Sequence, residues 1–210
     1  RTNIMYRITK NNTLTFNHML NHFDRASDDP MVPAAENAMR EKRSFMKNIV
    51  GLSYENLAFK NKLRTTIFGK GYIMTRNASL RTKTGTGPNQ QINLIETNLT
   101  TSNFSFGGAV SYRIIQSLMV TASAERAVRL PEANEIFGIV AENIIANPSL
   151  KPERSDNFNL GLEFNPNKEK HNVVFRPNIF LRNTNDLILR YNQGGNDQNL
   201  MSGNIGKVFT

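Results

Sequence analysis

The sequence predicts an all-β chain that forms part of an antiparallel transmembrane β-barrel. Three observations point to this fold class: apolar and polar residues alternate along several segments, apolar runs are short, and short and long connections take turns. No uninterrupted apolar run exceeds three residues, and a transmembrane helix needs about 20, so a membrane-spanning helix is excluded. Strands of a membrane barrel give a much weaker hydropathy signal and remain compatible with the chain.

Alternation with a period of two defines the expected strands. A strand points successive side chains to opposite faces, so alternation indicates one apolar and one polar face. The expected strands cover residues 2–9, 13–24, 43–56, 62–78, 103–113, 118–129, 155–165, 171–192 and 205–210. The one segment with helical character, residues 33–39, lies inside a polar loop.

The alternation differs in regularity from strand to strand. It is weak in the second and third strands, through Leu14, Phe16 and Leu20 and then Val50, Leu52 and Tyr54. It is regular in the fifth and sixth strands, through Phe104, Phe106, Val110, Tyr112 and Ile114 and then Leu118, Val120, Ala122 and Ala124. It is strict over residues 157–164, where the apolar members are Phe158, Leu160, Leu162 and Phe164. In the strand over 171–192, Val174 and Phe180 interrupt the pattern.

The connections divide into two groups that alternate along the chain. The short ones are residues 10–12, 57–61, 114–117 and 166–170, and the long ones are 25–42, 79–102, 130–154 and 193–204. Short turns on one side and long loops on the other are typical of an outer-membrane barrel. Strands of 11 or more residues also suit a tilted membrane strand of about 9–11 residues better than a sandwich strand of about 5–6. A soluble antiparallel sandwich stays open as an alternative, because alternation does not tell which face lies inside.

Charge and residue types give little sign of catalysis. The chain has 26 Lys and Arg against 17 Asp and Glu, a formal charge of +9, and no Cys. The basic residues are scattered and belong to no recognition module, so we expect no nucleic-acid partner. His18 and His22 on one strand face would stand about 13 Å apart, too far to share a metal. Glu132 and Glu135 lie in a loop without a nucleophile. We therefore predict no enzyme, no catalytic or metal site and no cofactor.

One long motif carries a family resemblance. Arg129, Pro131 and Glu135 are followed by the run Asn147-Pro148-Ser149-Leu150-Lys151-Pro152-Glu153, which leads into a strand with Asn157, Leu160 and Gly161. This arrangement resembles the barrel of TonB-dependent outer-membrane receptors, with Asn159 standing where Glu is common. The resemblance covers residues 120–210 by motif, and the N-terminal half only by its rhythm of strands and loops.

The resemblance implies the architecture of a larger protein. It implies a 22-stranded barrel closed by an N-terminal plug, with a TonB box that engages the inner-membrane energy-transducing system. Residues 1–210 would form about nine strands of that one barrel domain. Because the chain begins and ends as if within strands, we expect a fragment that lacks the plug and the C-terminal strands.

The resemblance also implies a function: active import of a scarce nutrient, such as a ferric siderophore, across the outer membrane of a Gram-negative bacterium. The expected partners are the TonB system, outer-membrane lipid and lipopolysaccharide, and a small nutrient ligand. A passive or structural outer-membrane barrel, or a soluble β-sandwich binding module, would be the alternative.

The motif residues are expected to shape the rim of the barrel rather than to contact the substrate. Proline fixes φ and disfavours helix, so Pro131, Pro148 and Pro152 would stiffen the connection where it leaves and rejoins the sheet. The rim set is Arg129, Pro131, Glu135, Asn147, Pro148, Leu150, Lys151, Pro152 and Glu153. Three further cations on the polar strand faces, Arg113, Arg176 and Arg182, are expected to face the lumen and to meet the plug or an anionic ligand.

Overall fold

The computed structural model describes residues 1–27, 41–84, 91–139, 143–166, 173–192 and 200–210, and this part of the chain is almost entirely β-structure. The strands are β1 (Thr2–Thr9), β2 (Asn12–Ser27), β3 (Glu41–Ala58), β4 (Leu63–Thr84), β5 (Gln91–Ile115), β6 (Leu118–Arg129), β7 (Ile144–Ile145), β8 (Glu153–Phe164), β9 (Asn178–Asn185), β10 (Ile188–Asn192), β11 (Leu200–Asn204) and β12 (Lys207–Phe209). The helix α2 (Ala133–Phe137) has five residues, and no helix in the described ranges is long and apolar enough to cross a membrane.

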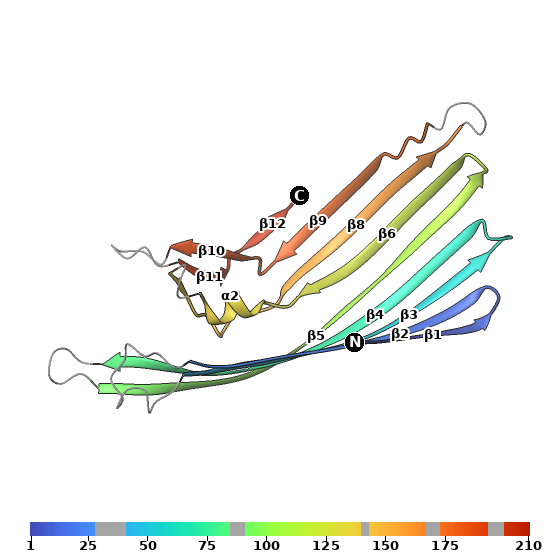
Figure 1. Ribbon diagram of the computed structural model, residues 1–210. Helices are drawn as coiled ribbons and strands as arrows, with labels where there is room; N and C mark the ends of the chain where they lie inside the picture. Colours follow the sequence, from blue (N-terminus) through green and yellow to red (C-terminus); the bar gives the residue numbers. More distant parts are fainter. Residues whose placement is uncertain (28–40, 85–90, 140–142, 167–172, 193–199) are drawn as a thin grey trace.

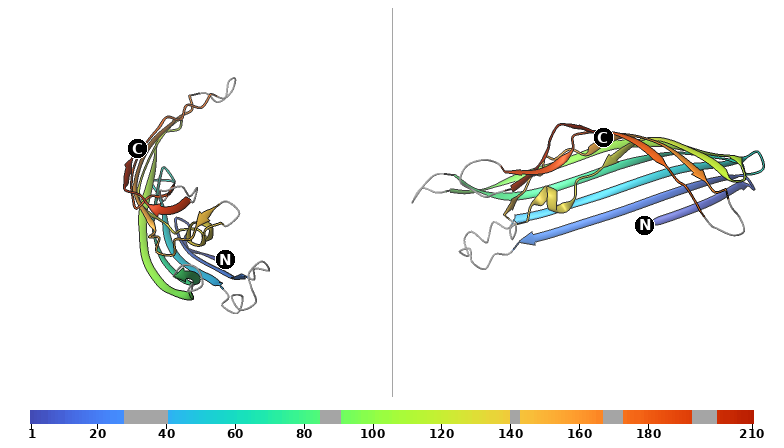
Figure 2. Two further views of the ribbon diagram at one scale, coloured as in Figure 1. Left: turned by 90° about the vertical axis from the view of Figure 1, so that its left-hand side faces the viewer. Right: turned by 90° about the horizontal axis from the view of Figure 1, so that it is seen from above.

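One large antiparallel sheet dominates the structure. Over the described ranges it has nine strands in the order β1-β2-β3-β4-β5-β6-β8-β9-β12, and neighbours in the chain pair with each other. The sheet is open and strongly curved (Figure 1), and it bends around α2 and the hairpin of β10 and β11 (Figure 2). Short turns join the strands at the end where β1, β3 and β5 finish, called here the short-turn end. The opposite end, where β2, β4 and β6 finish, is the long-connection end.

The two faces of the sheet differ as the alternation predicts. On β8, Phe158 and Leu160 lie on the convex face and are 55% and 54% exposed. Their neighbours Asn157 and Asn159 lie on the opposite, concave face, where Asn157 is buried. Among the described residues no second sheet covers the convex apolar face, as one would in a β-sandwich. The prediction of an antiparallel all-β chain is confirmed.

The predicted loop over residues 79–102 is wrong. β4 continues to Thr84, and β5 begins at Gln91, with these two extensions paired in unbroken register from Thr75–Thr100 to Thr84–Gln91. Apolar residues do not alternate regularly with polar ones along these extensions, although the backbone pairing continues there. A pattern search that looks for alternating hydrophobicity therefore ends the strands too early.

The predicted strand over residues 171–192 is also wrong in its continuity. The chain turns between β9 and β10 at Asp186, which has a φ of 56°, and the partner strand turns at Gly206, with a φ of 62°. These bends direct the β10–β11 hairpin into the concave side, where β11 pairs in parallel with β7. The predicted strand over 205–210 shortens to β12, and the expected helix over 33–39 lies outside the described residues.

Candidate functional site

The connection between β6 and β8 packs onto the concave face of the sheet. α2 supplies Ile136 and Phe137, which join Phe45 of β3 and Met74 of β4 in a buried apolar cluster. The Phe137 ring stacks on Phe23 at 6.0 Å between centroids and lies 6.2 Å from the Phe45 ring. The described residues of the predicted long loop over 130–154 therefore include a folded element, α2, which is held by burial of aromatic side chains.

Local sequence explains how this connection folds. Pro131, which is almost fully buried, directly precedes the first turn of α2, and the backbone N–H of Glu132 donates to the Glu135 carboxylate at 2.8 Å. The helix ends at Gly138, whose φ of 68° and extended ψ suit glycine. A Cβ there would collide with the carbonyl oxygen of Ile144, whose backbone exchanges two hydrogen bonds with Ile139.

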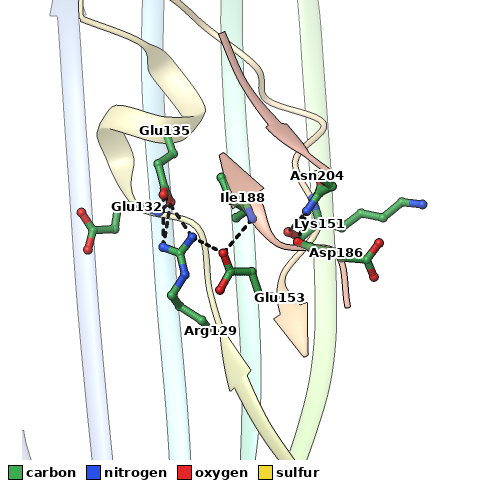
Figure 3. Close-up of polar contacts among 8 residues, drawn as sticks. All are labelled: Arg129, Glu132, Glu135, Lys151, Glu153, Asp186, Ile188 and Asn204. Atoms are coloured by element: carbon green, nitrogen blue, oxygen red, sulfur yellow. Dashed lines mark hydrogen bonds and ion pairs between the residues drawn. The ribbon is translucent and has the colours of Figure 1, made fainter. Parts of the chain in front are cut away.

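Arg129 is the centre of a charged network at the long-connection end (Figure 3). Its Nη2 donates to Glu153 Oε1 at 2.6 Å and to Glu135 Oε1 at 3.1 Å. Glu153 Oε1 also accepts the backbone N–H of Ile188 at 2.7 Å. The three motif charges thus meet in space and connect the last residue of β6, α2, the first residue of β8 and the first residue of β10.

The electrostatics of this network favour the charged forms. Hydrogen bonding to Glu153 is the main cause that raises the pKa of Arg129, with a further contribution from Glu135. Burial acts to raise the pKa of Glu153, but the bonds from Arg129 and from the Ile188 N–H outweigh it and leave that pKa lowered. Both groups lie beyond the convex apolar band, which on β8 begins at Phe158.

Amide side chains tie the second half of the motif to β11. Asn147 Nδ2 donates to the Ser202 carbonyl at 2.8 Å. The backbone of Lys151 exchanges two hydrogen bonds with the Asn204 side chain, at 2.8 and 2.9 Å, and Asn204 Nδ2 also donates to the Asp186 carbonyl at 2.7 Å. Asn204 therefore fixes the bend between β9 and β10 to the strand entry of β8.

Two arginines of the concave face complete the attachment. Arg76 of β4 is 1% exposed and donates to the Leu150 carbonyl at 2.6 Å. Arg43 of β3 donates to the Phe137 carbonyl at 3.2 Å. Sequence reasoning missed both of them. Alternation places Arg43 and Arg76 on the polar face. The carbonyl groups that accept their hydrogen bonds lie 94 and 74 residues further along the chain, and no sequence pattern predicts these partners.

The three arginines expected in the lumen lie in different settings. Arg182 on β9 donates to Asn157 Oδ1 at 2.9 Å, and Asn157 in turn donates to Glu125 on the same concave face. Arg176 follows the short-turn end of β8 and donates to Glu163 at 2.8 Å. Arg113 is near the end of β5, in register with Met119. Contact of these arginines with a ligand or a plug stays a prediction.

The arrangement holds the chain together and offers little chemistry. Arg129, Glu135, Asn147 and Glu153 bond to other groups of the same chain, and Leu150 is buried, which supports a structural role for the motif. No group of three or more His, Asp or Glu side chains in the described ranges could hold a metal ion. The bonds of the motif join the connection between β6 and β8 to the β10–β11 hairpin on the concave side of the sheet.

Solved structures with a similar fold include a receptor and a transporter. The chain is similar to the Serratia marcescens hemophore receptor HasR, solved in complex with its hemophore HasA and heme, with a TM-score of 0.67 and 13% identity over 99% of this chain and 36% of HasR. It is similar to the copper transporter OprC, with a TM-score of 0.72 and 14% identity over 99% of this chain and 33% of OprC. The chain thus spans about a third of each of these proteins. At such identities the likeness shows the fold alone.

The family follows from the sequence itself. No curated protein matches the chain by sequence. The family model described as "TonB dependent receptor-like, beta-barrel" matches residues 7–210, which is nearly the whole chain and includes both the motif and the earlier strands. TonB-dependent receptors are transporters rather than enzymes. The chain therefore belongs to the TonB-dependent receptor-like β-barrel family.

Proposed function

We propose that this chain is part of the barrel of a Gram-negative outer-membrane receptor that imports a scarce nutrient by TonB-driven active transport. The main support is that one curved sheet has an exposed apolar convex face and a polar concave face. The chain also matches this family over residues 7–210. Convex side chains that face hydrocarbon and concave ones that face an enclosed interior are the arrangement of a membrane barrel.

The proposed partners follow from the family. The energy-transducing TonB system would act through an N-terminal plug and TonB box elsewhere in the protein. Lipid and lipopolysaccharide would surround the convex face and the long-connection end. A small nutrient ligand would enter from the long-connection end, and no nucleic acid is involved.

A ferric siderophore is the substrate that we propose first. HasR is described as a hemophore receptor in complex with heme, and OprC as a copper transporter, so the fold accommodates metal-containing cargo of different kinds. Specificity of a receptor resides in loops and in site chemistry rather than in the fold. Iron chelates, heme and copper complexes therefore form the panel to be tested.

Uptake by cells that carry the complete gene tests the proposal. Cells lacking the gene would be complemented and supplied with each radiolabelled metal complex under metal limitation. We expect accumulation of one complex, and its loss when TonB is deleted. A passive pore would instead admit solutes without TonB and conduct ions continuously in a planar bilayer, and that pair of results would overturn the proposal.

A further inference from the structure

The short-turn end of the sheet carries an excess of positive charge. Among the described residues, seven basic side chains lie in the short connections or within four residues of that end, against two carboxylates. Both carboxylates are engaged, Glu55 by Arg64 at 3.7 Å and Glu163 by Arg176 at 2.8 Å. All seven cations are exposed, and they are Arg7, Lys10, Lys60, Lys62, Arg64, Arg113 and Arg176. This end of the sheet therefore favours an anionic partner.

Three of these cations lie in the turns themselves. Lys10 lies in the β1–β2 turn, Lys60 and Lys62 lie in the β3–β4 turn, and neither turn contains a carboxylate. The two turns are neighbours at the end of the sheet away from α2 (Figure 1), because the backbone N–H of Leu57 donates to the Asn11 carbonyl at 2.8 Å. None of the three lysines forms an ion pair with another described residue. Their charges are therefore available to a partner outside the chain.

The turn lysines differ from the arginines of the strand ends in where they lie. Strand alternation places Arg7, Arg64 and Arg113 on the concave face, so these arginines face the enclosed interior. The turn lysines lie beyond the last paired residues of their hairpins, Thr9–Asn12 and Ala58–Leu63. Neither face of the sheet confines them to the interior, and they can reach the surroundings of the barrel.

The apolar convex band extends to the same end of the sheet. Tyr112 of β5 and Phe164 of β8 lie on the convex face, in register with Leu63 and Leu118 beside two of the short turns. Beyond the band, Phe59 in the β3–β4 turn is 70% exposed and has a φ of 51°, which is uncommon for a bulky residue. Aromatic side chains at the edge of an apolar band are typical of a membrane–water interface. The turn lysines thus lie at the level of lipid head groups.

We propose that Lys10, Lys60, Lys62 and Phe59, called here the turn patch, bind the head group of an anionic phospholipid such as phosphatidylglycerol. This inference rests on the proposed function, because the short turns of an outer-membrane barrel lie on the periplasmic side, opposite the end that meets lipopolysaccharide. The ammonium groups attract the lipid phosphate, and each lysine near an anionic surface adds to the attraction. The Phe59 ring packs against the first acyl carbons.

The charge of the turn patch selects against a zwitterionic head group. The ammonium of phosphatidylethanolamine would meet three lysines and no carboxylate in these two turns, and like charges repel. The hydroxyl groups of phosphatidylglycerol bring no such repulsion. The preference should therefore depend on the charge of the turn lysines, whereas the Phe59 ring should contribute equally to both lipids.

Native mass spectrometry of the complete receptor, purified in a mild detergent, tests the proposal. The probes are phosphatidylglycerol and phosphatidylethanolamine with identical acyl chains. We expect phosphatidylglycerol to be retained about tenfold more strongly or better, since a single lysine near an anionic surface already contributes several-fold. The triple variant Lys10→Gln, Lys60→Asn, Lys62→Gln should lower the ratio of the two lipids by about tenfold or more. Asparagine suits the φ of 56° at residue 60.

A matched triple variant at the opposite end is the control. Lys42, Lys151 and Lys207 are exposed lysines of the long-connection end, and their replacement by Gln removes the same charge from the chain. This variant should keep the lipid ratio of the wild type. Phe59→Asn removes the ring in a backbone conformation that suits asparagine. It should weaken retention of both lipids and leave their ratio unchanged.

Several results would overturn the inference. They are equal retention of the two lipids by the wild type, an unchanged ratio in the folded turn triple variant, an equal loss of preference in the control triple variant, or an acidic periplasmic protein retained in place of the lipid. If the turn triple variant fails to fold, as judged by loss of the β-sheet circular dichroism signal, Lys60→Asn alone should still lower the ratio, and an unchanged ratio would be equally decisive.

Metal-complex uptake is measured in parallel with lipid retention. Selective retention of phosphatidylglycerol without TonB-dependent uptake would defeat only the proposed function. Uptake without selective retention would defeat only this inference.

Discussion

Arg129 and Glu153 form the shortest ion pair among the described residues, at 2.6 Å, and the acceptor oxygen of Glu153 also binds the first amide of β10. The carboxylate therefore serves two donors from distant parts of the chain. Because Arg129 binds Glu135 as well, a single guanidinium couples α2 to the β10–β11 hairpin. The attachment of both elements to the concave face should respond to changes at this pair.

Glu153→Gln should loosen the hairpin without unfolding the sheet. The substitution removes the charge-assisted bond to Arg129, and a hydrogen bond to a charged group contributes roughly 1.5–3 kcal/mol. We expect faster amide hydrogen exchange at Ile188, with exchange in the middle of β8 unchanged. Glu163→Gln, which breaks an exposed pair with Arg176, is the matched control and should cost at most about 1 kcal/mol. Equal protection of Ile188 in the wild type and in Glu153→Gln would contradict the expectation.

The contribution of Glu153 should depend on pH in one direction. Its pKa is lowered in the folded chain, so the folded state binds this proton less tightly than the unfolded state does. The stabilisation is fully present above the ordinary carboxyl pKa and is lost as the pH falls through the lowered folded-state pKa. The difference in Ile188 protection between wild type and Glu153→Gln should therefore shrink in acid. A difference that stays constant from neutral to acid pH would count against it.

Gly138→Ala should disturb the pairing of Ile139 with Ile144 that follows α2. The residue has a φ of 68°, and the added Cβ would meet the Ile144 carbonyl oxygen. The backbone strain alone is of order 1–3 kcal/mol, and the collision adds to it. We expect limited proteolysis to cut residues 130–152 faster than in the wild type. Gly206→Ala, whose Cβ would meet nothing within 4 Å, carries only the strain and should show no effect on this connection.

Arginine substitutions at neighbouring positions of β8 should report which face meets lipid. Leu160→Arg would place a charge near the middle of the convex apolar band, at a cost of about 2–4 kcal/mol. Asn159→Arg would place the same charge on the concave face and should cost far less. Refolding of the complete receptor into lipid vesicles measures both. If Asn159→Arg were the more damaging change, the assignment of the faces would be reversed.

Arg182→Gln should weaken binding of the imported complex if the lumen-facing arginines contact an anionic ligand. Loss of one hydrogen bond to a charged group costs roughly 1.5–3 kcal/mol, which corresponds to about a 10- to 150-fold loss of affinity. The measurement is the binding affinity of the imported complex for the receptor. The control is Arg64→Gln, a concave-face position near the short-turn end that pairs with Glu55. Unchanged affinity in Arg182→Gln would remove the hypothesis for this residue.

The sequence predicts the bounds of a strand well where one face of the strand is apolar and the other is polar. The bounds of β6, Leu118–Arg129, agree with the prediction, and β8 differs by one or two residues at its ends. In these segments one face is apolar and the other polar, so the period of two is visible. The extension of β5 from Gln91 lacks such a contrast, and no pattern marked it as a strand.

The motif was found by sequence, but its geometry was not. Arg129, Glu135 and Glu153 were singled out, yet nothing predicted that the Ile188 amide would share the same carboxylate. The folding of α2 onto Phe45 depends on contacts between residues about 90 positions apart, which local propensity does not encode. The bends at Asp186 and Gly206 rest on backbone conformations that Asp and Gly permit but do not require.

The bends at Asp186 and Gly206, where the paired strands β9 and β12 continue into the β10–β11 hairpin, have a mechanical consequence. A 2.7 Å hydrogen bond from the Ile205 N–H to the Leu187 carbonyl joins the two strands at the level of the bends. Neither strand can straighten alone without breaking this bond, so a change of bend in one strand requires the same change in the other. A force or a ligand that reached either strand would therefore move both.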